Sequence, residues 1–167
     1  VFNGPSSEIA DTDIDLSVGG KSEYKVVVPE NCSETILFAA NELTSLFARS
    51  TGAVLPVVKD STANFTNSDK VLSVGNTKLL LSSGENVDPS ALNTDGFILK
   101  RKGNAVLMAG GSENGTVYAV YEFLSENLGY EFYAINETYS EKHENVKLKD
   151  FNQTEIPDFR ERTSYYR

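Results

Sequence analysis

Residues 95–129 read DGFILKRKGNAVLMAGGSENGTVYAVYEFLSENLG, and this stretch predicts a hairpin, a glycine-rich turn and a helix in succession. Two apolar runs, 95–101 and 105–109, flank Gly103 and Asn104, a pair that suits a tight turn between antiparallel strands. Behind the second run, apolar residues at helical spacing predict a helix that starts at Thr116 and ends at Gly129.

The chain before residue 95 also alternates strands and helices. Apolar runs at 23–29 and 70–75 predict two strands, and 54–58 predicts a shorter one whose internal proline favours the edge of a sheet. The strongest helix signal follows Ser33 and stops at Gly52. Its apolar residues recur on one helix face: Ile36, Leu37, Ala40, Leu43, Leu46 and Phe47.

Weaker signals complete this pattern. Residues 76–81 suggest a short helix, 82–93 a loop, and 130–134 and 146–148 two further strands. Together the elements predict an α+β fold, in which two main amphipathic helices pack on a mixed, largely antiparallel sheet.

The length and composition predict one domain. The chain has 167 residues, of which 40% are hydrophobic and 23% charged. We expect a polar leader at 1–22, a single α/β domain at 23–150, and a linker with the start of a further unit at 151–167. Pro157 breaks the preceding structure, and the aromatic and arginine-rich run behind it has no partner segment in the chain. We therefore expect a domain that belongs to a larger protein.

The charge and cysteine content of the chain restrict the binding partners and cross-links that we expect. The formal net charge is -9 and the basic residues are scattered, so nucleic acid is not an expected partner. No apolar run approaches the roughly 18 to 20 residues that span a bilayer. The single cysteine, Cys32, forbids an internal disulfide. Five glycosylation sequons occur, which carry sugar only in a host with the machinery: Asn31, Asn64, Asn114, Asn136 and Asn152.

The glycine-rich turn at Gly110, Gly111 and Gly115 permits two interpretations. A strand, a glycine turn and a helix N-terminus form a plausible anion cradle, because free backbone amides and the helix dipole point at the gap. However, the spacing lacks the lysine of a phosphate loop and the Gly-x-Gly-x-x-Gly of a dinucleotide fold. The pattern favours close packing of helix on sheet and leaves phosphate binding as the alternative.

The sequence offers few other candidates for catalytic or metal-binding residues. The one histidine, His143, lies among charged residues, so neither a histidine metal set nor a Ser-His-Asp triad can be assembled. Cys32 precedes a helix start but has no second cysteine to act with. We predict no catalytic residue, no metal site and no cofactor in this chain.

An ordered set of short motifs carries a family resemblance. These motifs are Ala39-Ala40-Asn41-Glu42-Leu43, Thr51-Gly52, Val74-Gly75-Asn76-Thr77, Asp95-Gly96-Phe97, and Gly110-Gly111 through Gly115 to Leu124. Over roughly residues 22–162, the chain resembles the non-catalytic α/β domain that precedes the barrel in α-glucuronidases, β-hexosaminidases and large bacterial proteins with a similar barrel. The resemblance implies a fold like the second domain of β-hexosaminidases.

The same resemblance accounts for the end of the chain. In β-hexosaminidase-like enzymes a Pro-x-Phe-x-x-Arg segment leads into the first barrel strand, and its arginine contacts the bound sugar. Pro157, Phe159 and Arg162 match this spacing, whereas Thr163 replaces the family's glycine. The resemblance thus implies Arg162 as a substrate-binding residue, and a solvated linker arginine is the alternative.

The resemblance implies that this domain is separate from the catalytic one, because the catalytic carboxylates of such enzymes lie on the barrel. We expect an accessory domain of a secreted, periplasmic or cell-surface glycoside hydrolase. Its partners are then the C-terminal catalytic barrel of the same polypeptide and, through it, an oligo- or polysaccharide. The alternatives are a carbohydrate-binding module and a phosphate- or nucleotide-binding domain at the Gly110–Gly115 turn.

Overall fold

The computed structural model describes residues 9–130 and 143–156. In these residues, a six-stranded sheet has the order β3-β2-β4-β6-β5-β8, and β1 and β7 form a separate two-stranded ribbon. The strands are β1 (Asp11–Ser17), β2 (Lys25–Val28), β3 (Val57–Lys59), β4 (Val71–Val74), β5 (Phe97–Lys102), β6 (Ala105–Gly110), β7 (Val146–Lys149) and β8 (Asn152–Glu155). The helices are α1 (Glu34–Thr51), α2 (Lys78–Ser82), α3 (Pro89–Leu92) and α4 (Glu113–Leu128).

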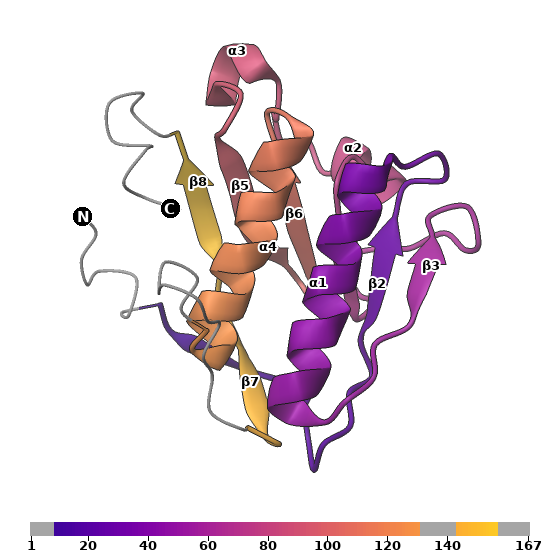
Figure 1. Cartoon of the computed structure of the whole chain (residues 1–167), viewed down its shortest axis with the longest axis vertical. Coiled ribbons are helices and arrows are strands. Elements are labelled where there is room, and N and C mark those ends of the chain that lie inside the picture. The colour runs from indigo at the N-terminus through magenta and orange to yellow at the C-terminus, as the bar shows by residue number, and fades with distance from the viewer. Residues whose placement is uncertain (1–8, 131–142, 157–167) are drawn as a thin grey trace.

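The expected α+β class, a mixed sheet with two main amphipathic helices, is confirmed. Figure 1 shows α1 and α4 side by side across one face of the sheet. Strand β2 pairs in parallel with β3 and β4, and β4 pairs in parallel with β6. Strand β5 is antiparallel to β6 and β8, and β1 is antiparallel to β7. The antiparallel pairings therefore lie on one side of β6 and in the ribbon.

The strongest helix signal is confirmed at both ends. Ser33 is the N-cap of α1, and its hydroxyl accepts a hydrogen bond from the backbone N–H of Ile36. Gly52 ends the helix in the left-handed conformation, with φ of 84°. The capping residues thus set the length of α1, as the sequence predicts.

The predicted hairpin is confirmed, but α4 begins earlier than expected. Strands β5 and β6 pair from Phe97 opposite Gly110 to Lys102 opposite Ala105. The helix starts at Glu113 after an extended Ser112, so Gly115 lies inside its first turn and not before it. A glycine is tolerated there because tertiary contacts outweigh its weak helix propensity.

Strand alternation creates a core on each face of the larger sheet. Val26, Leu72 and Val106 point towards α1 and α4 and belong to the larger core. Val27, Val71 and Leu107 point to the opposite face, which Leu79 and Leu80 of α2 and Leu92 of α3 cover. Helices that follow different strands therefore lie on opposite faces of one sheet.

Three elements lie where the sequence suggested none. Strand β1 lies in the expected leader and pairs with β7, and β8 lies in the expected linker and pairs with β5. Helix α3 lies in the expected loop 82–93. The two strands depend on partners far away in the chain, so local patterns carry little signal for them. The strand expected at 130–134 extends beyond the described residues.

Candidate functional site

The candidate site is a cleft at the carboxyl ends of the parallel strands β2, β4 and β6. Its volume is about 340 Å³, within the range of about 300 to 1,000 Å³ typical of small-ligand sites. The cleft receives residues from the loop after β2, the loop after β4, the start of α3 and the turn between β6 and α4. Segments far apart in the sequence therefore meet at one end of the sheet.

The strand order explains why a cleft opens there. Strands β2 and β4 are neighbours, but β2 leads through α1 to β3, whereas β4 leads through α2 and α3 towards β5 and β6. Because α1 packs on one face and α2 and α3 on the other, the two loops diverge after these strands. Such a switch point in strand order is where open α/β sheets usually bind ligands.

The cleft is lined by uncharged polar and acidic side chains over an apolar wall. Asn31, Asn76, Asp88 and Glu113 contribute carboxamides and carboxylates, and all four are exposed. The apolar part of the lining consists of Pro29, Ile36, Val87 and Pro89. No lysine, arginine or histidine occurs among the described lining residues. The lining therefore offers many hydrogen-bond acceptors and no positive side chain.

The serine before α4 leaves the first turn of this helix without a side-chain cap. Ser112 is the N-cap residue, yet its hydroxyl donates to the backbone carbonyl of Thr94 and makes no capping hydrogen bond. Asp88, the N-cap residue of α3, likewise makes no side-chain capping bond. The carboxylate of Asp88 is thus not engaged in capping at the edge of the cleft.

The glycine turn is explained by close packing of backbone on backbone. A Cβ atom at Gly115 would lie 2.3 Å from the carbonyl oxygen of Gly96, and one at Gly111 would lie 2.0 Å from that of Asn93. A Cβ atom at Gly110 would lie 2.5 Å from the Cα of Gly115. These contacts account for all three glycines without a ligand. Anion binding at this turn stays a prediction.

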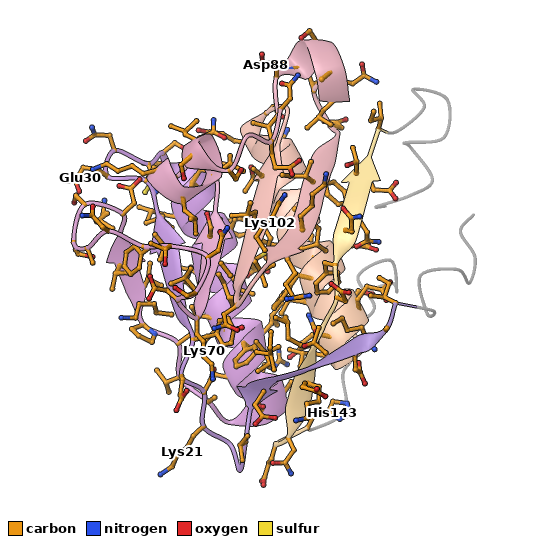
Figure 2. The ribbon with its side chains drawn as sticks, turned by 180° about the vertical axis from the view of Figure 1, so that it is seen from behind. Lys21, Glu30, Lys70, Asp88, Lys102 and His143 are labelled. Carbon is orange, nitrogen blue, oxygen red and sulfur yellow. The ribbon has the colours of Figure 1, made fainter. Side chains whose placement is uncertain are left out.

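Of the other residues that the sequence singled out, Cys32 lies at the cleft and His143 lies far from it (Figure 2). Cys32 is half-buried at the cleft, just before the start of α1. Figure 2 labels Asp88 near one end of the molecule and His143 near the other, where the His143 backbone N–H donates to Ser50. Arg162, with Pro157 and Phe159, lies outside the described residues. In residues 9–130 and 143–156, no group of three His, Cys, Asp or Glu side chains is placed to hold a metal ion.

The sequence singled out Gly110, Gly111 and Cys32, which line this cleft, but it did not identify the side-chain acceptors there. Asn31 lies in the loop after β2 and Asn76 in the loop after β4, so both lie at the carboxyl ends of parallel strands. This position is the signal that would have identified them. It is usable only once β2 and β4 are known to be neighbours.

A charged clamp holds the loop that leads to the cleft. The Oε1 atom of Glu85 lies 2.9 Å from Nζ of Lys100, and its Oε2 atom lies 2.9 Å from Nζ of Lys102. The Glu85 side chain is 15% exposed. Figure 2 shows Lys102 on the sheet face that turns away from α1 and α4. The clamp therefore ties the segment before Val87 and Asp88 to β5.

The clamp predicts an acid-dependent loss of stability. Burial by itself would raise the pKa of Glu85, but the hydrogen bonds and charges of Lys102 and Lys100 outweigh it and lower the pKa. Because the folded-state pKa is the lower one, the contribution is complete above the ordinary value of 4.5 and is lost as the pH falls through the lowered value. We expect the stability difference between wild type and Glu85→Gln, measured by urea denaturation, to shrink from pH 7 to pH 3.

A matched control is Glu23→Gln. Glu23 also pairs with a lysine, Lys70, but its side chain is 80% exposed, so little stability depends on its charge. If the Glu85→Gln difference stays constant over this pH range, the clamp does not act through the charge of Glu85.

The fold of this chain is also found as a domain within two solved carbohydrate-active hydrolases. The chain is similar to part of the GH20 β-N-acetylhexosaminidase from Streptomyces coelicolor A3(2), with a TM-score of 0.53, 12% identity, and coverage of 90% of this chain and 25% of that one. It is also similar to part of BtGH115A, a GH115 4-O-methyl-α-glucuronidase with specificity for decorated arabinogalactans. That likeness has a TM-score of 0.56 and 21% identity, and covers 85% of this chain and 18% of that one.

The chain belongs to the family of glycosyl hydrolase family 67 N-terminal domains, whose family model matches residues 17–123. The expected likeness to N-terminal domains of α-glucuronidase-like and hexosaminidase-like hydrolases is thereby confirmed. No curated protein matches the chain. The chain spans between 18% and 25% of the length of the two solved structures. In the described part of the chain, no helix is both long and apolar enough to cross a bilayer.

Proposed function

We propose that this domain is a catalytically silent accessory domain, which supports and orients a catalytic barrel in the same polypeptide of a carbohydrate-active hydrolase. The observation that carries the proposal is the family match over residues 17–123, from the end of β1 into α4. The match includes the parallel half of the sheet, the whole of α1 and the first part of α4. The substrate of the whole protein is then an oligo- or polysaccharide.

The acidic side chains that are largely buried support a structural role for this domain. Asp60 is 6% exposed and accepts hydrogen bonds from the backbone N–H groups of Glu30 and Lys78. Glu85 is held between two lysines. Glycoside hydrolysis needs two carboxylates free to act on the bond between sugars, roughly 5 to 9 Å apart. Asp60 and Glu85 are instead committed to holding the fold, so neither of these two is available as one of the carboxylates.

The proposal also covers the last residues of the chain and the cellular location of the protein. The residues that follow β8 would include the linker and the start of the (β/α) barrel, with Arg162 as a sugar contact from that barrel. A protein that degrades polysaccharide meets its substrate outside the cytoplasm. We therefore infer a secreted, periplasmic or cell-surface protein.

The test compares three proteins: the full-length parent polypeptide, a variant without residues 1–155, and the 167-residue chain. We expect hydrolysis of aryl glycosides by the parent and none by the 167-residue chain. We expect the variant without the domain to melt at least about 5 °C below the parent, because it exposes an interdomain interface of about 600 to 1,500 Å². Hydrolysis by the 167-residue chain, or an unchanged Tm and kcat/KM in the shortened variant, would contradict the proposal.

A further inference from the structure

We propose that the cleft at the carboxyl ends of β2, β4 and β6 binds a neutral saccharide. The choice of saccharides among hydroxyl-rich ligands rests on the proposed function. The site itself does not, because its location follows from the strand order. The domain would then hold an uncharged stretch of the polysaccharide in addition to supporting the barrel.

The first argument is the location of the cleft. The loops after β2 and β4 diverge to opposite faces of the sheet, and the turn after β6 closes the third side. A second hollow, lined by Asp15, Lys21 and Lys70 among others, has a volume of about 460 Å³ but lies by the amino end of β2 and next to β1. Ligands of open α/β sheets bind at the carboxyl ends of the strands, which favours the smaller cleft.

The second argument is the chemistry of the lining. Carboxylate and carboxamide oxygens accept hydrogen bonds from hydroxyl groups, and carboxamide N–H groups donate to hydroxyl and ring oxygens. Asp88 and Glu113 supply the carboxylates, and Asn31 and Asn76 supply the carboxamides. Pro29 and Val87 add an apolar surface of the kind that packs against the C–H face of a sugar ring. The lining thus combines the two kinds of contact that a neutral sugar needs.

The third argument concerns charge, which separates this proposal from anion binding. The two carboxylates repel a phosphate, and no lysine or arginine among the described lining residues offsets them. They also repel the carboxylate of a uronic acid. The cleft is therefore suited to an undecorated part of a polysaccharide and unsuited to an acidic side group.

The test is a titration of the 167-residue chain followed by ¹H–¹⁵N correlation spectra. The ligands are neutral xylo-, gluco- and chito-oligosaccharides, a glucuronate-substituted xylo-oligosaccharide, and inorganic phosphate. We expect saturable shifts of the backbone amides of residues 30–33, 75–76, 87–88 and 110–113 with at least one neutral oligosaccharide. We expect weaker binding of the glucuronate-substituted ligand than of its neutral counterpart, and no saturable shift with phosphate.

Variants identify the groups that bind. We expect Asp88→Ala and Glu113→Ala each to weaken the affinity about tenfold, the effect of losing one hydrogen bond to a charged group. Both residues are exposed, so neither change should unfold the chain. Glu144→Ala is the matched control, because Glu144 is also an exposed acid but lies next to His143, at the far end of the molecule. We expect that variant to bind like the wild type.

Three results would overturn the proposal: no saturable shift with any neutral oligosaccharide, shifts confined to residues outside the cleft, or saturable phosphate binding at residues 110–113. The last result would support the anion interpretation of the glycine turn. None of these results affects the measured stability of a barrel with and without residues 1–155. A failure of the saccharide site and a failure of the proposed function are therefore distinguishable.

Discussion

Gly115→Ala is expected to lower the free energy of unfolding by about 3 kcal/mol, at the upper end of the range for overpacked sites. In an exposed helix the same change would stabilise by roughly 1 kcal/mol, because alanine has the higher helix propensity. Here the added Cβ atom would lie 2.3 Å from the carbonyl oxygen of Gly96 and 3.0 Å from the Cα of Gly110. Since both neighbours are backbone atoms, α4 must move away from β5 and β6 to make room.

The measurement is urea denaturation of the wild type and the variant at pH 7, with a common slope to confirm a two-state transition. Asn114→Ala is the matched control, because Asn114 precedes Gly115 in the same helical turn and is exposed. We expect that control to change the stability by no more than about 0.5 kcal/mol. A Gly115→Ala variant as stable as the wild type would show that the helix can shift freely, and would remove the packing explanation for this glycine.

Asp60→Ala is expected to destabilise the domain by about 3 kcal/mol, because hydrogen bonds to a charged acceptor contribute about 1.5 to 3 kcal/mol each. One carboxylate oxygen of Asp60 accepts from the backbone N–H of Glu30 at 3.1 Å, and the other accepts from that of Lys78 at 3.0 Å. Glu30 lies in the loop after β2, and Lys78 begins α2 after β4. Asp60 therefore ties together the two loops that diverge at the cleft.

Two further variants isolate the role of this carboxylate. Asp60→Asn keeps one acceptor oxygen and should lose less stability than Asp60→Ala. Asp69→Ala is the control, because Asp69 accepts from the backbone N–H of Thr66 at 2.8 Å in an exposed turn. We expect the control to lose less than about 1 kcal/mol in urea denaturation. Equal losses for Asp60→Ala and Asp69→Ala would mean that burial of the Asp60 carboxylate adds nothing.

Much of the fold could be predicted from short-range signals. Ser33 and Gly52 delimit α1 because a capping side chain and a left-handed residue act within one turn of the helix. The hairpin of β5 and β6 forms around Gly103, whose φ is +64°. Strands β1 and β8 could not be predicted in the same way, because each depends on a partner more than 50 residues away.

The candidate site was predicted less completely than the fold. Gly110, Gly111 and Cys32 do lie at the cleft, and the sequence had singled them out. The same sequence could not show that Asn76 and Asp88 lie beside them, since the loops that carry these residues are separated along the chain. These hydrogen-bond acceptors form a site only because strand pairing brings the loops that carry them together.

The sequence by itself determined both ends of α1, the C-terminal end of α4, the hairpin and the apolar runs that form the buried strands, because these depend on neighbours within a few positions. The tertiary structure alone decided that β2 and β4 are neighbours, that their helices cover opposite faces, and that a cleft opens where their loops diverge. It also decided that Gly115 is needed for contact with Gly96. These features depend on the packing of segments remote in sequence, which local propensity does not encode.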